Sequence, residues 1–196
     1  MASLKMHLAV AKRYLEKHPG EIKNEREFYT GNIAPDFDPD KENSHYGKRG
    51  ESKDLVKRHR EKVGLDKFLQ ANKLDTDFDK GRYLHLLADW VYYNELLSHE
   101  YLRTVDMEQF PKDNIYTSIA YDKHLEEKYG AHYGLTSMEQ EIKAAFEKWT
   151  AYDQARWGKN FTGQVLFTRE QLDDFIETLT ATPVFTPSAL ASSLSM

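Results

Sequence analysis

The chain has 196 residues, of which 40% are hydrophobic, so it is long enough to form one domain with a substantial core. Lys and Arg total 27 against 32 Asp and Glu, which gives a net charge of −5 and a pI near 5.9. This acidic balance argues against general binding to nucleic acids or acidic membranes. The absence of cysteine excludes disulfides, thiolate zinc sites and thiol catalysis, so His and carboxylate side chains must bind any metal.

The N-terminal region predicts a helix and no targeting segment. Residues 4–18 alternate apolar and basic residues with helical period and precede Pro19-Gly20, which predicts a helix that stops there. The stretch has no apolar core of the kind found in secretory signals, and no later run reaches about 18 apolar residues, as a transmembrane helix would. We therefore expect a cytoplasmic protein with no transmembrane segment. His7 lies on the inward stripe of this helix, where a lone His is usually a hydrogen-bonded core residue.

A long loop is the next predicted feature. A short helix is expected over residues 21–29, ending at Gly31. Residues 31–45 then contain two prolines and several turn-forming residues, which predicts a loop of a length that is usually functional or disordered. Asp36, which follows a proline, and His45 are the candidates for chemistry in this loop.

A basic stretch follows the loop. Residues 46–62 contain seven Lys or Arg and three Asp or Glu. Such a run is usually a solvated helix face, and its other interpretation is a surface that attracts phosphate. Lys48 and Arg49, close after His45, are the candidates for phosphate binding.

The most apolar part of the chain predicts a buried central helix. An almost unbroken apolar run over residues 83–102 contains no Pro or Gly and is preceded by Asp79, a potential N-cap, which indicates a helix over about residues 79–103 that other helices bury. His85 and Asp89 are four residues apart, so they differ by ~40° around the axis and ~6 Å along it and share one face. Such a pair can bind one cation from a single helix, or it can be a hydrogen-bonded pair in the core.

The rest of the chain predicts further helices and no sheet. Helices are expected over residues 114–129, 137–157 and 168–179, the last two with capping boxes at their first residues, whereas only residues 164–167 have strand character. We predict an all-α fold, a single-domain helical bundle over residues 1–182 around the central helix. Residues 183–196, rich in Ser and Ala, are expected to form a flexible tail.

The candidate ligands come from three separate segments. His7, Asp36, His45, His85 and Asp89 offer three imidazoles and two carboxylates. Two His and two Asp complete a four-ligand site for a cation such as zinc, and His7 is then available to hold a second ion bridged by a carboxylate.

The order of these motifs carries a resemblance. Met-His near the N-terminus is followed by Gly-Asn-Ile-Ala-Pro-Asp, then Ser-His, then Tyr-Leu-His-Leu-Leu-Ala-Asp. This order, over residues 5–130, resembles the bacterial zinc-dependent phospholipase C family, which is related to the fungal zinc nucleases. The chain is most similar to the short intracellular branch of that family.

The resemblance implies an all-helical phospholipase C/zinc nuclease-like fold that hydrolyses phosphate esters with a metal cluster in a cleft. By position, one zinc would be held by Asp36, His45, His85 and Asp89. His7 and Asp89 would hold another ion, and Asp122 is the best remaining candidate to complete that second site. The residue at the Asp36 position is considered a general base in the family.

A site of this kind supports phosphoryl chemistry. A metal-bound water has its pKa lowered toward ~7, and two ions can clamp the attacking and leaving oxygens. Asp36 or Asp89 would orient the water, while Lys48 or Arg49 would neutralise the phosphate. One or two Zn²⁺ ions are expected, with Mn, Fe or Ni as alternatives, because affinity order alone does not decide occupancy.

Two functions are consistent with these residues. The first is a metal-dependent phosphoesterase that acts on a phospholipid, a nucleotide or a small phosphodiester. The alternative is a non-catalytic helical module with a structural metal that binds a phosphorylated ligand or partner. Closed four-ligand coordination favours the alternative, because catalysis needs an open position for water.

Overall fold

The protein is all-helical, as the sequence predicts. The computed structural model describes residues 2–48 and 54–186, and this part of the chain contains no strand, only an isolated antiparallel bridge between Tyr46 and Val63. The elements in chain order are α1 (Leu4–Lys17), α2 (Glu25–Phe37), α3 (Lys41–His45), α4 (Leu55–Arg60), α5 (Leu65–Ala71), α6 (Asp77–Val91), the π-helical turn η1 (Tyr92–Leu96), α7 (His99–Thr104), α8 (Gln109–Tyr129), the 3-10 turn η2 (Tyr133–Leu135), α9 (Glu139–Trp157) and α10 (Arg169–Leu179).

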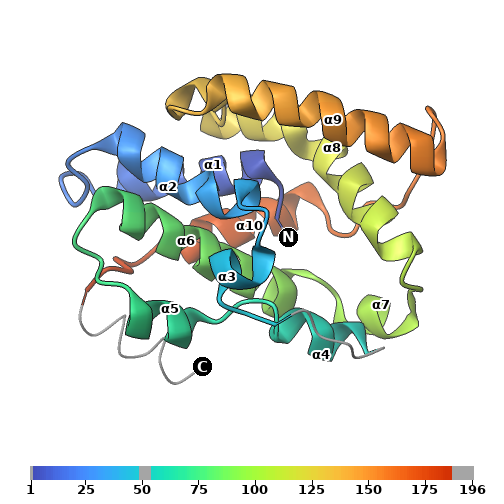
Figure 1. Ribbon diagram of the computed structural model, residues 1–196, viewed down its shortest axis with the longest axis horizontal. Helices are drawn as coiled ribbons and strands as arrows, with labels where there is room; N and C mark the ends of the chain where they lie inside the picture. Colours follow the sequence, from blue (N-terminus) through green and yellow to red (C-terminus); the bar gives the residue numbers. More distant parts are fainter. Residues whose placement is uncertain (1, 49–53, 187–196) are drawn as a thin grey trace.

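The arrangement places α6 among the other helices. In Figure 1, α9 lies at one edge of the molecule, α4 and α5 lie at the opposite edge, and α6 lies between them. Helix α6 packs mainly against α2, and α1 packs against α2, α6 and α8. Within the described ranges, no helix combines the length and the apolar character that a membrane crossing requires.

Helix α1 confirms the prediction for the N-terminal region. Ser3 caps the helix by accepting a hydrogen bond from the backbone N–H of Met6, and α1 ends at Lys17, before Pro19-Gly20. Its inward stripe includes Leu8 and Tyr14, both fully buried. The stripe is the reason the helix forms here, because burial of this face against α2 and α8 supplies stability that a short isolated helix lacks.

The predicted loop over residues 31–45 is wrong. Helix α2 begins at Glu25 after the N-cap Asn24, continues through Gly31 and ends at Phe37, and a separate short helix, α3, then covers Lys41–His45. Gly31 does not end a helix, and Pro35 lies inside the last turn of α2, where it removes one helical hydrogen bond without breaking the helix.

The reason for Gly31 is the close crossing of α2 and α6. A Cβ atom on Gly31 would lie 2.0 Å from the carbonyl oxygen of Phe78, and a Cβ atom on Gly81 would lie 2.1 Å from the carbonyl oxygen of Phe28. The two backbones are therefore in direct contact, which only glycine permits at these positions. The side chain of Asn32 also reaches across and donates to the carbonyl of Gly81 at 3.4 Å.

The predicted central helix is buried, but it is shorter than residues 79–103. Thr76, not Asp79, is the N-cap, and its hydroxyl oxygen accepts from the backbone N–H of Asp79. After α6 the chain widens into the π-helical turn η1, leaves the helix at Leu97 and starts α7 with Ser98 as a new N-cap. The apolar run over residues 83–102 therefore covers two helices, because burial and helix continuity are separate properties.

The C-terminal predictions are confirmed in part. Helix α8 begins at Gln109 rather than at residue 114 and ends at the left-handed Gly130. Ser137 does not cap α9, because its backbone N–H donates to the hydroxyl of Thr30 and the helix begins at Glu139. The capping box at the start of α10 is present. Residues 164–167 form no strand.

The predicted tail begins in contact with the core. The backbone N–H of Val184 donates to the Tyr14 hydroxyl at 3.2 Å, and the ring of Phe185 lies 5.2 Å from the Tyr14 ring. Residues 187–196 of this tail lie outside the described residues.

Replacing Gly31 by Ala tests the helix crossing. Ala is the better helix former by about 1 kcal/mol, so propensity alone predicts greater stability. The added Cβ would meet three backbone atoms of Phe78 within 3 Å. We therefore expect Gly31→Ala to lower the free energy of unfolding by about 2 kcal/mol, as measured by urea denaturation. Gly81→Ala should behave in the same way, and a rise in stability in either variant would contradict the crossing.

Candidate metal centre

Four helices bring the five predicted ligands together. His7 comes from α1, Asp36 from the end of α2, His45 from the last residue of α3, and His85 and Asp89 from α6. All five side chains are buried, and those of His7, His85 and Asp89 are completely inaccessible to solvent. The structure therefore confirms that these residues lie in one cluster.

Three of the five ligand atoms, those of His45, His85 and Asp89, have mutual separations close to those of a tetrahedral site, and Asp36 approaches His45. The Nε2 atom of His45 lies 3.3 Å from His85 Nε2, 3.6 Å from Asp89 Oδ2 and 3.9 Å from Asp36 Oδ1. His85 Nε2 lies 3.8 Å from Asp89 Oδ2. An ion with bonds of ~2.0–2.1 Å to tetrahedral ligands separates them by ~3.3–3.4 Å, so small side-chain movements complete the coordination.

Hydrogen bonds away from the cluster fix the tautomers of two histidines. The Nδ1–H of His85 donates to the carbonyl of Asn32 at 2.7 Å. The Nδ1–H of His45 donates to the hydroxyl oxygen of Ser44 at 2.9 Å, and that hydroxyl donates in turn to the carbonyl of Pro35 at 3.1 Å. Both Nε2 atoms are therefore unprotonated, which is the form that binds metal.

This tautomer assignment makes the contact between the two imidazoles unfavourable without a cation. The Nε2 atoms of His45 and His85 direct their lone pairs at one another across 3.3 Å. Two lone pairs at that distance repel, whereas a cation between them is attracted to both. The alternative of a simple core hydrogen bond between His85 and Asp89 does not fit, because the Nδ1–H of His85 is used by Asn32 and its Nε2 lies 3.8 Å from the carboxylate.

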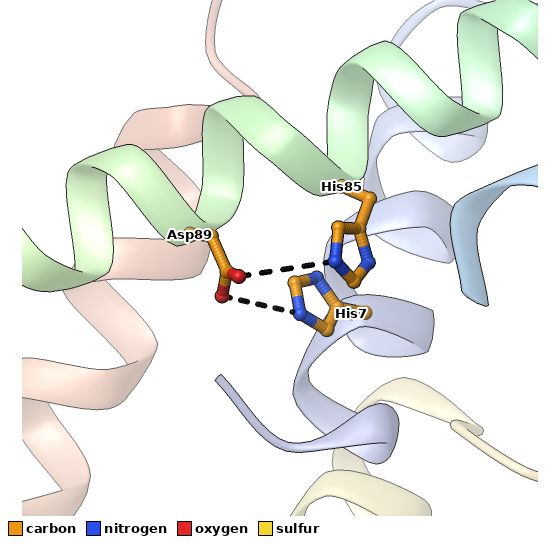
Figure 2. Close-up of side chains that lie close together, drawn as sticks. All are labelled: His7, His85 and Asp89. Carbon is orange, nitrogen blue, oxygen red and sulfur yellow. Dashed lines mark ion pairs between the residues drawn. The ribbon is translucent and has the colours of Figure 1, made fainter. Parts of the chain in front are cut away.

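His7 approaches the other oxygen of the same carboxylate. Its Nε2 lies 3.4 Å from Asp89 Oδ1, and its ring stacks on that of His85 with centroids 3.8 Å apart. Figure 2 shows the carboxylate of Asp89 facing both of these imidazoles. The backbone N–H of Ala2 also donates to Asp89 Oδ1, at 2.8 Å. Asp89 therefore presents one oxygen to His45 and His85 and the other to His7, as a bridging carboxylate does.

Several buried polar atoms of the cluster lack hydrogen-bond partners. They are Nδ1 and Nε2 of His7, Oδ1 of Asp36 and Oδ2 of Asp89. An unpaired buried polar group costs about 1–3 kcal/mol, and more when it is charged. Metal ions would contact three of these atoms, Asp36 Oδ1 and Asp89 Oδ2 at one position and His7 Nε2 at another, and the groups His7, His85, Asp89 and Asp36, His45, His85 can each contribute to holding an ion.

The electrostatics of the cluster favour the protonation states that metal binding needs. Burial, followed by the proximity of His7, lowers the pKa of His85 well below its usual value. Burial alone would raise the pKa of Asp89, but hydrogen bonds from His45 and His7, when these rings carry a proton on the nitrogen that faces the carboxylate, outweigh burial and hold that pKa well below the usual value. His85 is therefore neutral and Asp89 ionised at neutral pH.

Asp122 is not part of the cluster. It lies on α8 and pairs with Lys5 at 3.7 Å, and neither group of convergent ligand atoms includes it. The prediction that Asp122 completes the second site is therefore not supported by its position. The spacing of residues on α8 gave no information on which side of that helix faces α6.

A pocket of about 380 Å³ opens onto the cluster, with His45 and Asp89 in its wall. Lys48 lines this pocket as predicted for a phosphate-binding residue, and Arg49 lies outside the described residues. Lys41 also lines it; its ammonium lies 3.5 Å from Asp36 Oδ1 and donates to the carbonyl of Pro35.

Three residues that support the site were not predicted from the sequence. They are Lys41, Asn32 and Ser44, although Ser44 directly precedes His45 and Asn32 directly follows the crossing glycine. Their roles depend on hydrogen bonds to groups distant in sequence or across a turn, for which the sequence contains no spacing rule.

The ligand assignment predicts the metal content of three variants. His85→Ala and Asp89→Ala should each abolish metal binding, because each variant lacks one of the atoms that would coordinate the ion. Lys57→Ala should leave the metal content unchanged, since Lys57 is an exposed residue of α4 outside the pocket. Elemental analysis of protein purified without chelator measures this, and metal retained in Asp89→Ala would refute the assignment.

Ser44→Ala tests the positioning of His45. Loss of the hydroxyl removes the acceptor that holds the His45 Nδ1–H, so the ring can rotate or change tautomer. We expect metal affinity to fall by about 10- to 100-fold, measured by competition with a chelating dye. Ser118→Ala is the matched control, because that hydroxyl also donates to a backbone carbonyl but lies on α8 outside the cluster. Equal affinity in Ser44→Ala and wild type would exclude the positioning role.

No family model, no curated protein and no solved structure matches this chain. The site is therefore interpreted from its own geometry.

Proposed function

We propose that the chain is a metal-dependent hydrolase of phosphate esters. The observation that carries this proposal is the set of buried, unpaired ligand atoms of His7, Asp36 and Asp89, in a cluster that reaches the wall of a pocket lined by cations through Asp89 and His45. Buried unpaired carboxylates and imidazoles are costly, and they cluster at functional sites for that reason. The adjacent cations are suited to an anionic substrate.

The donor set fits one or two borderline cations. Imidazole nitrogen and carboxylate oxygen suit Zn²⁺, and also Mn, Fe and Ni. Asp36, His45, His85 and Asp89 would hold the first ion, and His7 with the second oxygen of Asp89 would hold another. When bound, the ions would supply Lewis acidity and lower the pKa of water.

The protein residues have distinct roles in the proposed reaction. Asp36 lies nearer to solvent than the other carboxylate of the cluster, so it would accept a proton from the attacking water. Asp89 would orient the reacting groups from the buried side. Lys41, 3.5 Å from Asp36 Oδ1, would position that carboxylate, and Lys48 would neutralise the phosphate while the bond between phosphorus and the leaving oxygen breaks.

The resemblance to the zinc-dependent phospholipase C family is part of the proposal. The order of the ligands along the chain supports it, as does the convergence of those ligands in an all-helical structure. The phospholipase C-like bundle and the cytoplasmic location remain predictions from the sequence.

The alternative is a non-catalytic module that keeps a structural metal. A structural site is closed, whereas here His45 and Asp89 form part of a pocket wall. His45 is the ligand in this wall that keeps some exposed side-chain surface, 5%, and this contact with the pocket favours catalysis, because the attacking water and the substrate both need an open position.

The proposed function is tested by comparing the hydrolytic activity of the metal-loaded protein with that of the protein after a chelator has removed the metal. Protein purified with its metal should hydrolyse 4-nitrophenyl phosphate or bis(4-nitrophenyl) phosphate, lose this activity with a chelator and regain it with Zn²⁺. Asp36→Asn should lower kcat by about 10²- to 10⁴-fold through loss of the general base. Asp75→Asn, a change of the same kind at an exposed residue, should be unaffected. Bound metal without any turnover would support the structural-metal alternative.

A further inference from the structure

The pocket beside the metal centre carries more positive charge than metal binding requires. Among the described residues, its wall includes four cationic side chains and two carboxylates, and one of those carboxylates, Asp89, belongs to the ligand cluster. The cations are Lys41, Lys48, Arg58 and Lys62. This excess is local, because the whole chain has a net charge of −5.

Arg58 is the cation of this pocket best placed to bind a ligand. Its side chain is half-buried on α4, and its Nη1 donates to the sulfur of Met107, at 3.6 Å. A thioether is a weak acceptor, and within the described ranges Arg58 has no ion pair with a carboxylate. Lys41, in contrast, is held by the carbonyl of Pro35 and by Asp36. A half-buried guanidinium without an anionic partner is suited to an oxyanion of the ligand.

A second part of the pocket wall is apolar. It includes Met107, Phe110, Pro111 and Ile115, from the start of α8 and the residues just before it, and the ring of Tyr93. A volume of about 380 Å³ is at the small end of the range for ligand sites. The space therefore suits a compact apolar group, such as one ring, beside the charged group that Arg58 attracts.

We propose that this pocket selects a phosphate ester with two negative charges and a compact apolar body, and that Arg58 determines this selectivity. The inference rests on the proposed hydrolase function. One charge is met by the metal centre through the phosphate, and Arg58 with Lys48 meets the other. An ester with a quaternary ammonium group is rejected, because its cation would lie among like charges in a partly desolvated pocket.

Esters that share a 4-nitrophenyl leaving group and differ in charge provide the kinetic test. The dianions are 4-nitrophenyl phosphate and the 4-nitrophenyl, 4-carboxyphenyl diester. The monoanion is the 4-nitrophenyl, phenyl diester, and the zwitterion is 4-nitrophenylphosphorylcholine. Wild type should have the highest kcat/KM for a dianion, and comparison of the two dianions identifies whether the second charge is on phosphorus or on the neighbouring group.

Arg58→Gln should raise KM for the dianions by about 10- to 100-fold and change it less than about threefold for the monoanion and the zwitterion. Arg156→Gln is the matched control, because Arg156 is exposed on α9 and its contact is the ring of Trp157 at 4.9 Å. An unchanged melting temperature shows that the Arg58 variant is folded. Equal changes for all four esters, or no change, would overturn the inference.

A binding measurement separates this inference from the proposed function. Phenylphosphonate is a dianionic probe with one ring that cannot be hydrolysed, and benzyltrimethylammonium is its cationic counterpart. Calorimetry with the purified protein should detect phenylphosphonate but not the cation, and Arg58→Gln should weaken the phosphonate by about tenfold or more. If no ester is turned over, the hydrolase proposal fails, but the binding measurement still shows whether the pocket prefers a dianion and whether Arg58 is responsible. Binding that is unchanged in Arg58→Gln refutes the selectivity.

Discussion

The close contact between α2 and α6 determines where the candidate ligands lie. Because Gly31 and Gly81 have no side chains, the two backbones touch, and the carbonyl of Asn32 comes within 2.7 Å of His85 Nδ1. The same register brings Asp36, about one turn further along α2, close to His85 on α6. Any residue larger than glycine at the crossing would separate the helices and move both carboxylates. The candidate site thus depends on a packing constraint that involves no ligand.

The cluster is a poor core if it holds no cation. Three imidazoles and two carboxylates are buried together, and four of their polar atoms lack hydrogen bonds to the described residues. At about 1–3 kcal/mol for each unpaired atom, this arrangement opposes folding by an amount comparable to the stability of a whole domain. An apolar core of the same volume would avoid that cost. Ion binding offsets it, which couples the stability of the fold to occupancy of the site.

The sequence predicts the parts of this structure that depend on local rules. The first helix, the capping box of α10 and the shared face of His85 and Asp89 follow from spacing and composition. The loop predicted over residues 31–45 fails because glycine and proline are turn signals on average, whereas Gly31 serves a helix crossing. The break after η1 was missed for a related reason, because the apolar run continues across it.

The contacts of the site between residues far apart in the chain cannot be predicted from local sequence rules. Ala2 and Asp89 are 87 residues apart in the chain, yet they share a hydrogen bond. Arg58 belongs to a basic run, which is usually a solvated surface, and only the fold shows that Arg58, with Lys48 and Lys62 of the same run, lines the pocket. The ligands could be identified because metal binding limits the residue types, whereas supporting residues can be of almost any polar type.

The charge of the cluster connects the metal centre to the pocket. Metal binding requires ionised carboxylates and neutral imidazoles, so the five ligands of a loaded centre contribute a charge of about −2; one divalent ion then brings the centre to neutrality and two bring it to about +2. A neutral centre attracts a dianionic ester only weakly, and the attraction must then come from Arg58 and Lys48. With the position beside His7 also filled, the ions themselves attract the ester. Occupancy of that second position therefore sets how much of the substrate affinity depends on the side chains of the pocket.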